Sequence, residues 1–267
     1  MSPVQWYLPV EVGGDLGRLV ACAWTAVPTG THRLTPDGCV DMLRTSDGRF
    51  LVCGPERRSW QFRLPDHTTA VGLRFRPGAL RVVFGIDVAS IVDRTVALAE
   101  VAGDRRASQA EAALARLVSL DAQRDALVGL VGEWAHDRRP DRLDEAIVDA
   151  VVADAHQSVG ALAASIGMST RTLHRHCTRS FGYGAATLGR IVRFQRLLAV
   201  LHAAGPSWGL AAAAASAGYC DQAHLSGDCR AITGLRPVEF MAEWFPTFPD
   251  MSDPYKTRSP LVATIVV

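Results

Sequence analysis

Residues 159–182 read VGALAASIGMSTRTLHRHCTRSFG, and residues 210–234 read LAAAAASAGYCDQAHLSGDCRAITG. The two stretches are copies of one unit, because each places a Leu four residues before a Cys and that Cys five residues before a Gly. An internal repeat constrains the architecture of a chain more strongly than any local propensity does. The repeat therefore decides the fold of the region from Val159 to Phe240.

The first copy predicts a helix, a tight turn and a second helix. Apolar residues recur at the i, i+3, i+4, i+7 spacing of one helix face, at Val159, Leu162, Ala163 and Ile166. Gly167 suits the left-handed conformation that ends a helix. Ser169 can cap the next helix by accepting a hydrogen bond from a free backbone N–H. Gly182 closes the unit, and the residues of the second helix expected to face inward are Leu173, Cys177 and Phe181.

The second copy predicts the same structure with smaller side chains. Gly218 forms the turn, and Asp221 caps the second helix. The apolar stripe of the first helix is expected at Trp208, Ala211, Ala212 and Ala215, and that of the second helix at Leu225, Cys229 and Ile232. A longer helix that ends at Gly205-Pro206 joins the copies, with a core face at Leu188, Ile191, Phe194, Leu198 and Leu201. Each copy is thus a helix-turn-helix, whose second helix lies in the major groove of DNA.

This region resembles the DNA-binding domain of the AraC/XylS family of transcription regulators. The resemblance is carried by Leu162-Ala163, Gly167-Met168-Ser169, Leu173, Arg193-Phe194, Ala217-Gly218-Tyr219, the run from Asp221 to Leu225, Thr233-Gly234 and Pro237. It implies two helix-turn-helix units, joined by a long helix, that read adjacent major-groove segments of double-stranded DNA. In that family the residues that match Arg171, His174 and Arg175 face base edges.

The residues predicted to bind DNA follow from the repeat and from this resemblance. Arg171 and Arg175 are four residues apart on one helix face, and Arg to guanine is the commonest base-specific contact. Ser169 and Thr170 are expected to cap the helix and touch phosphate. Four further residues either contact phosphate or are solvated surface charges, and the sequence leaves both open: Arg190, Arg193, Arg196 and Arg230. The full predicted set is Ser169, Thr170, Arg171, His174, Arg175, Arg190, Arg193, Asp221, Gln222, His224 and Arg230.

Each unit departs from the pattern of the family. Cys177 and Cys229 stand where a core Phe is usual, which implies looser packing or compensation elsewhere. Gly227 stands where an Arg commonly projects toward DNA, and it is followed by Asp228, which would repel phosphate if it faced the duplex. We therefore expect the first unit to carry most of the sequence discrimination and the second unit mainly to position the protein.

The distribution of charge favours a nucleic-acid partner, although the net charge is only +1. Residues 158–245 hold eight Arg against four acidic residues, and no acidic residue occurs from 158 to 220. Lys256 is the only Lys among the 28 basic residues. Arg binds phosphate and guanine better than Lys because its planar guanidinium forms paired hydrogen bonds. A GC-rich genome explains the scarcity of Lys, whereas function explains the acid-free run.

Residues 1–103 differ in composition from the repeat region, because they are rich in Gly, Pro and short apolar runs. These runs, separated by turn signals such as Pro36-Asp37-Gly38, lie at residues 19–24, 40–43, 50–53, 60–64 and 70–75. Short strands at this spacing predict a β-sandwich or a small barrel. The segments Leu34 to Asp41, Cys53-Gly54-Pro55 and Val71 to Ala79 resemble the cupin-like N-terminal domain of one AraC subgroup. That resemblance implies a domain that senses a ligand or dimerises.

The remaining segments complete an α+β protein: an N-terminal cupin-like β-sandwich or barrel, a helical connector, and a C-terminal all-α double helix-turn-helix. Residues 104–140 predict the connector, with one apolar face at Ala110, Leu114, Leu117 and Val118 and another at Leu127, Leu130, Val131 and Trp134. A polar, Pro-containing stretch precedes the DNA-binding domain, which we place at residues 141–245. Residues 246–267 are expected to form a loosely ordered, Pro-rich tail with a β-prone end.

No constellation of residues for catalysis or metal binding is recognisable. The N-terminal domain holds only His32 and His67, far apart in sequence, whereas zinc ligands usually show short spacings. The six cysteines show no framework spacing, so we expect free thiols that behave as small hydrophobes. We therefore predict no enzyme activity, no cofactor and no metal. A metal- or thiol-sensing role for Cys22, Cys39 and Cys53 is a minor alternative.

The predicted function is a sequence-specific DNA-binding transcription regulator of the AraC type, controlled through its N-terminal domain. Candidate partners besides double-stranded DNA are a small-molecule effector, RNA polymerase and a second copy of the chain in a homodimer. No run of about 18 apolar residues and no secretory signal are visible, so we expect a cytoplasmic protein without a membrane partner. The alternative is a small-molecule- or metal-sensing protein, or a cupin-type enzyme domain, with a weakened DNA-binding half.

Overall fold

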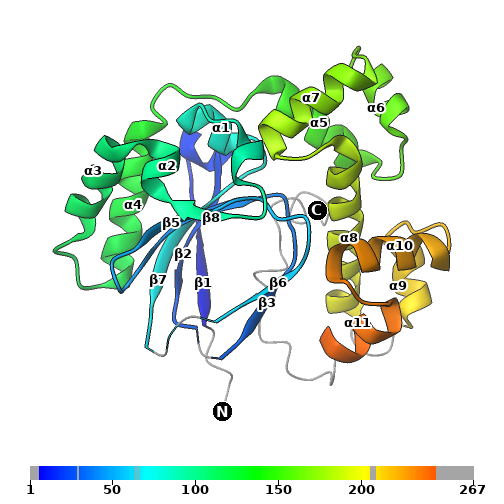
Figure 1. Ribbon diagram of the computed structural model, residues 1–267, viewed down its shortest axis with the longest axis horizontal. Helices are drawn as coiled ribbons and strands as arrows, with labels where there is room; N and C mark the ends of the chain where they lie inside the picture. The colour runs from blue at the N-terminus through cyan, green and yellow to red at the C-terminus, as the bar shows by residue number, and fades with distance from the viewer. Residues whose placement is uncertain (1–5, 29, 64, 66, 205–208, 245–267) are drawn as a thin grey trace.

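The computed structural model describes residues 6–244 apart from residues 29, 64, 66 and 205–208. Its N-terminal part is an antiparallel sheet flanked by helices, and its C-terminal part is built from helices (Figure 1). The predicted α+β class is thus confirmed. Trp208, Gly205-Pro206 and the predicted tail at 246–267 lie outside the described residues. No helix in the described ranges is both long enough and apolar enough to cross a membrane.

Short antiparallel strands form two sheets in the N-terminal part. The six-stranded sheet follows the order β1 (Tyr7–Glu11), β2 (Val20–Ala26), β7 (Ala70–Phe75), β4 (Val40–Thr45), β5 (Phe50–Cys53) and β8 (Thr95–Ala97). The smaller sheet pairs β3 (His32–Leu34) with β6 (Trp60–Phe62). The apolar runs correctly predict β2, β4, β5, β6 and β7. They miss β1, which contains Pro9, and the three-residue strands β3 and β8, which are too short to show an alternation.

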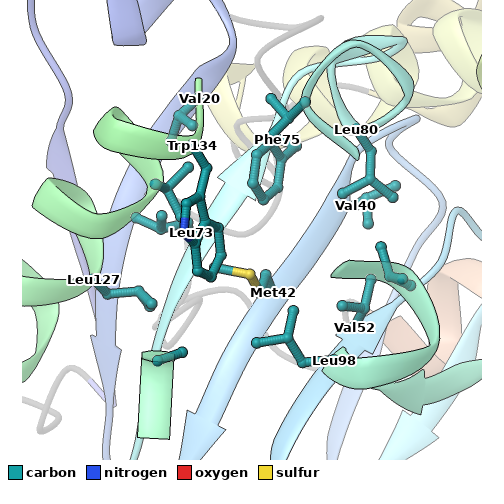
Figure 2. Packing of buried hydrophobic residues seen from close by; sticks show 14 of the residues in the cluster. Val20, Val40, Met42, Val52, Leu73, Phe75, Leu80, Leu98, Leu127 and Trp134 are labelled. Atoms are coloured by element: carbon teal, nitrogen blue, oxygen red, sulfur yellow. The ribbon is translucent and has the colours of Figure 1, made fainter. Parts of the chain in front are cut away.

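Helices cover one face of the six-stranded sheet (Figure 1). They are α1 (Ala79–Phe84), α2 (Leu98–Ala102), α3 (Asp104–Leu114) and α4 (Leu120–Trp134), together with the short 3₁₀ helices η1 (Asp15–Arg18) and η2 (Val88–Ile91). Figure 2 shows Met42 and Leu73 of the sheet beside Leu127 and Trp134 of α4, all of them buried in one hydrophobic cluster. Each such side chain contributes about 1.5–3 kcal/mol by leaving water.

The two helices predicted as a connector therefore share a core with the sheet. Their predicted buried face is correct at Ala110 and Leu114. It is wrong at Val118, which lies beyond the end of α3 and is 94% exposed. The helix ends because the chain turns toward α4, whose N-cap Ser119 accepts a hydrogen bond from the Ala122 N–H.

The C-terminal part is a pair of helix-turn-helix units on one long helix. Helix α5 (Arg142–Ala153) precedes the first unit, α6 (Val159–Ser165) and α7 (Thr170–Phe181). Helix α8 (Ala185–Ala204) leads to the second unit, α9 (Leu210–Ser216) and α10 (Gln222–Thr233), and α11 (Pro237–Trp244) follows. Helix α8 belongs to both units, because Ile191 is buried in the first core and Phe194 in the second. The predicted long helix is confirmed.

The apolar stripe predicted for α9 is wrong. Ala211, Ala212 and Ala215 are exposed, whereas Ala213 and Ala214 are buried. An alanine helix shows no contrast between its faces, so the predicted stripe depends only on its helical spacing from Trp208. The repeat itself gives the correct answer, since Ala213 and Ala214 occupy the positions of the buried residues Leu162 and Ala163 in the first unit.

Candidate nucleic-acid interface and enclosed cavity

Helix α7 presents a basic face to solvent. Arg171, His174 and Arg175 are exposed, and Leu173 and Cys177 on the opposite side are fully buried. This separation follows from the helical period, because residues three or four apart share a face. The structure therefore brings together the three residues predicted to face base edges.

The N-terminus of α7 is capped as its sequence indicates. The Ser169 hydroxyl accepts a hydrogen bond from the Thr172 N–H at 3.1 Å, and Thr170 is exposed beside it. Backbone N–H groups at a helix N-terminus attract anions. Both residues are thus placed where a DNA phosphate could approach this end of the helix.

His176 does not belong to the exposed face. Its Nε2 lies 2.6 Å from Oδ1 of Asp144, a buried residue of α5. Burial raises the pKa of the Asp144 carboxyl, and the hydrogen bond from His176 opposes that rise. The contact ties α7 to α5 and fixes the direction in which the basic face points.

Helix α10, the corresponding helix of the second unit, presents fewer charged groups. Gln222 and Arg230 are exposed. Asp221 is also exposed, but its carboxylate caps the helix by accepting from the His224 N–H at 2.7 Å. Gly227 faces open space, since a Cβ on it would meet nothing within 4 Å.

Asp228 does not face the DNA side of α10. It is 5% exposed, and its two oxygens accept hydrogen bonds from Arg190 Nε at 3.1 Å and Arg193 Nε at 2.9 Å. The expectation that the second unit presents Asp228 is therefore wrong. Two guanidinium groups of α8 hold this carboxylate, which fastens α10 to the long helix.

The arginines of α8 are mostly engaged within the protein. The side chain of Arg193 is 13% exposed and also donates to the Ala155 carbonyl. Arg196 donates to the Val152 carbonyl of α5, and burial lowers its pKa. The side chain of Arg190 is 38% exposed and so more accessible than that of Arg193. The structure therefore brings Arg190 and Arg193 to a carboxylate rather than to the exposed face of α7.

His224 is half-buried and lies against other aromatic rings. Its ring centroid is 5.6 Å from that of His156 and 5.2 Å from that of Tyr219, both in edge-on geometry. Its Nε2 lies 3.9 Å from Asp228 Oδ2. The ring is thus directed into the unit, away from the position of Gln222.

A cavity of about 200 Å³ lies on the other face of the six-stranded sheet, between it and the β3–β6 pair. Its walls carry four large aromatic side chains, Trp6, Trp24, Trp60 and Phe62. The polar groups among its lining residues include Asp37, Asp41, Glu56 and Arg74. Such a mixture, an apolar enclosure with few convergent polar groups, is typical of small-molecule sites.

The charged groups of the cavity are arranged around the buried Arg74. Its guanidinium lies 3.0 Å from Asp37 Oδ2 and 2.8 Å from Asp41 Oδ2, and Trp24 Nε1 donates to Asp41 Oδ1 at 3.0 Å. Burial and the nearby Asp37 and Asp41 carboxylates raise the pKa of Glu56 from 4.5 to about 8. Glu56 is thus an acid that stays largely neutral at pH 7.

Sequence reasoning did not assign these cavity residues. A usable signal was present, because Asp41 and Arg74 are charges inside apolar runs, and they pair directly across β4 and β7. Glu56 gave no such signal, since it lies in a turn segment where an acidic residue is ordinary.

Loops that line the cavity also touch the helix-turn-helix units. Gln195 of α8, fully buried, donates from Nε2 to Thr35 Oγ1 at 3.1 Å and to the Pro36 carbonyl at 2.6 Å. The Ser59 N–H donates to the Ile232 carbonyl of α10 at 2.7 Å. Thr35 lines the cavity, and Ser59 lies next to the lining residue Trp60. Figure 1 shows the β3–β6 pair on the side of the sheet that faces α8 and α10.

Comparison with protein families assigns both halves of the chain. A family model described as a helix-turn-helix domain matches residues 162–243. The C-terminal part is an AraC-type helix-turn-helix domain. A second model, described as a domain of unknown function (DUF6597), matches residues 13–97. The chain, which carries an AraC-type helix-turn-helix domain, is therefore a DNA-binding transcription regulator, and the predicted resemblance of this domain is confirmed.

Solved structures of ToxT from Vibrio cholerae align with this chain. ToxT with a bound unsaturated fatty acid aligns with a TM-score of 0.43 and 11% identity, over 85% of this chain and 96% of ToxT. A second ToxT structure aligns with a TM-score of 0.40 and 12% identity, over 82% of this chain and 95% of ToxT. No curated protein matches the chain.

Proposed function

We propose that this regulator binds DNA mainly through α7 and that a small molecule in the N-terminal cavity controls this binding. The observation that carries the proposal is the double role of the loops at Thr35-Pro36 and Ser59. They border the cavity, and they hydrogen-bond to α8 and α10 of the DNA-binding helices. A ligand that moves either loop must change the contacts of those helices.

The chemistry of the cavity favours a small organic cation with an apolar or aromatic body. Arg74 already neutralises much of the charge of Asp37 and Asp41, whereas Glu56 has no cationic partner among the described ion pairs. A ligand amine beside Glu56 would favour the ionised carboxylate, and the Trp faces would attract the same cation. The small volume limits the ligand to a single ring or a short chain.

The DNA contacts proposed for the first unit are Ser169, Thr170, Arg171, His174 and Arg175, and those for the second unit are Asp221, Gln222 and Arg230. Exposure supports all eight. Arg190 and Arg193 hold Asp228, and His224 faces His156, so these three act by positioning α10. A regulator of this kind needs no catalytic group, and we propose that the chain is not an enzyme.

A homodimer and RNA polymerase are the other proposed partners. Leu8 and Val10 on the edge strand β1 are 49% and 44% exposed, and an open strand edge can pair with a second copy. Light scattering of wild-type and Val10→Lys protein tests this surface. An identical mass for both variants would leave β1 without a role in dimerisation.

The control of DNA binding is tested with wild-type and Gln195→Ala protein. Amines that raise the melting temperature of the full chain are first identified, and a bound duplex is selected from random DNA. We expect such an amine to change the affinity of the wild-type protein for that duplex by at least about fivefold, the usual lower range of allosteric coupling. The change should be much smaller in Gln195→Ala. An equal change in both proteins would contradict the proposed route through α8.

A further inference from the structure

Three metal-ligating side chains from distant parts of the chain meet beside the second helix-turn-helix unit. His156 lies in the turn between α5 and α6, Cys220 in the turn before α10, and His224 in the first turn of α10. One ring nitrogen of each His and the Cys220 Sγ all lie within 4.8 Å of one another. The cluster thus joins the first unit to the second.

His156 is the member of the cluster whose buried ring nitrogens are left unsatisfied by the described residues. Both of its ring nitrogens are buried, and neither has a hydrogen-bond partner within the described part of the chain. A buried polar atom left without a hydrogen bond destabilises the folded protein. The chain nevertheless makes room for this ring, because a Cβ on Gly218 would lie 2.4 Å from His156 Nε2.

We propose that His156, Cys220 and His224 form a zinc site. Zinc binds Cys sulfur at about 2.3 Å and His nitrogen at about 2.0–2.1 Å in tetrahedral geometry, which places ligand atoms about 3–4 Å apart. Small side-chain rotations bring the three atoms from within 4.8 Å to that spacing. The fourth position belongs to a water molecule, since Cys220 is exposed and the Asp228 carboxylate beside His224 is held by two arginines.

The binding step is a proton-for-metal exchange at sulfur. The Cys220 thiol loses its proton to solvent, its thiolate binds Zn²⁺, and the two neutral imidazoles donate one nitrogen lone pair each. No electron is transferred. The step adds one net positive charge at the start of α10.

Zinc in this position fixes how the two units are oriented. His156 belongs to the turn that enters the first unit, and His224 belongs to the helix by which the second unit approaches DNA. A metal bridge between them resists rotation of α10 relative to α6. Zinc should therefore tighten binding to a duplex that both units contact, and should leave binding by the first unit alone unchanged.

Cobalt titration of the full-length protein tests the ligand set. The protein is freed of metal by chelator dialysis in a non-thiol reductant, and Co²⁺ is then added. We expect one Co²⁺ per chain, the visible absorption of tetrahedral cobalt, and a thiolate-to-cobalt charge-transfer band that zinc abolishes. Cys220→Ser should lose that band and bind Co²⁺ at least about tenfold more weakly, and His156→Gln should show a similar loss of affinity.

Two variants serve as matched controls. Cys53→Ser removes another accessible thiol, and His136→Gln removes an 81% exposed imidazole, both far along the chain from the cluster. Both should bind Co²⁺ as the wild type does. Circular dichroism verifies that all four variants are folded. A wild-type protein without the charge-transfer band, or a Cys220→Ser protein with unchanged Co²⁺ affinity, would overturn the site.

Discussion

Arg175 and Gln222 are the single residues at which the proposed division of DNA recognition between the two units can be tested. Both side chains are exposed, but Arg175 shares its helix face with Arg171 and His174, whereas Gln222 has the bare Gly227 on its helix. A bidentate guanidinium contact to a base discriminates by about 1–3 kcal/mol. The first unit therefore holds the stronger means of reading sequence.

Arg175→Ala should accordingly cost about 1–3 kcal/mol of binding free energy on a selected duplex, and much less on random DNA. Gln222→Ala should cost less on the same duplex. Fluorescence anisotropy with both duplexes measures the two losses side by side. An equal or larger loss for Gln222→Ala would show that the second unit reads bases despite Gly227.

Glu56 gives a pH-dependent stability with a definite sign. Burial and the Asp37 and Asp41 carboxylates raise its pKa in the folded protein to about 8, from 4.5. The proton bound by Glu56 stabilises the folded protein fully below pH 4.5. Between pH 4.5 and pH 8 this stabilisation is lost, and the free energy of unfolding falls by about 1.4 kcal/mol for each pH unit. The Glu56→Gln variant keeps the size of the side chain and removes its titratable carboxyl group. Its melting temperature should therefore exceed that of the wild type increasingly from pH 6 to pH 8.5, and a constant difference would refute the shift.

At the scale of the element, α10, the second helix of the second unit, lacks a basic side chain at its centre. Gly227 is exposed, and a new side chain there meets no atom within 4 Å of its Cβ. Gly227→Arg should tighten DNA binding and should raise the slope of log affinity against log salt by about one, because one more phosphate is neutralised.

Gly227→Ala is the matched control for this substitution. It should stabilise the helix by up to about 1 kcal/mol without changing the salt slope. Comparing binding isotherms over a range of salt concentrations separates the two effects. If Gly227→Arg and Gly227→Ala gave the same slope, the centre of α10 would not approach the DNA backbone.

The elements of the DNA-binding part could be predicted from sequence because their signals are local. Caps at Ser169 and Asp221 and the glycines at 167 and 218 mark the turns, and the Leu and Cys positions mark the buried faces. The buried face of α9 is not marked locally, since alanine does not distinguish inside from outside, and only alignment with Leu162 and Ala163 of the first unit identifies Ala213 and Ala214. The inward turn of Asp228 depends on α8, thirty-five residues earlier, which holds Arg193.

The cavity and the His156 cluster could not be predicted for a different reason. The cavity is lined by residues from Trp6, before β1, to Thr95 of β8, so its members are scattered over ninety residues of sequence. In the cluster, Cys220 and His224 do show the short spacing that is typical of metal ligands, but His156 lies in another unit. The packing of α5 and α10 against the same helix, α8, brings the three together.

At the scale of the whole molecule, the two halves differ in what holds them together. The hydrophobic clusters lie within one half or the other: the main one of the first half runs from Val12 to Ala135, and the second half has one from Ile147 to Val192 and another from Phe194 to Phe240. Many described contacts between the halves are polar, among them the hydrogen bonds of Gln195 and Ser59 and the ion pair of Arg33 with Glu243, while Gly182 after α7 lies against Val88 and Val92. A polar junction of this kind can be remade when a ligand binds, without disturbing either core.

This arrangement makes the first half separable, and we place the boundary just after the turn in which the Arg138 N–H donates to the Ala135 carbonyl at 2.9 Å. A fragment of residues 1–138 keeps the whole first cluster, including α3 and α4, and loses only the junction with the helix-turn-helix units. It should unfold cooperatively and show the circular dichroism of a mixed strand and helix domain. A fragment of residues 1–103, which lacks α3 and α4, should expose Met42 and Leu73 and should aggregate or melt without cooperativity. If the shorter fragment were as stable as the longer one, α3 and α4 would be a connector after all, and the core drawn in Figure 2 would not depend on Leu127 and Trp134.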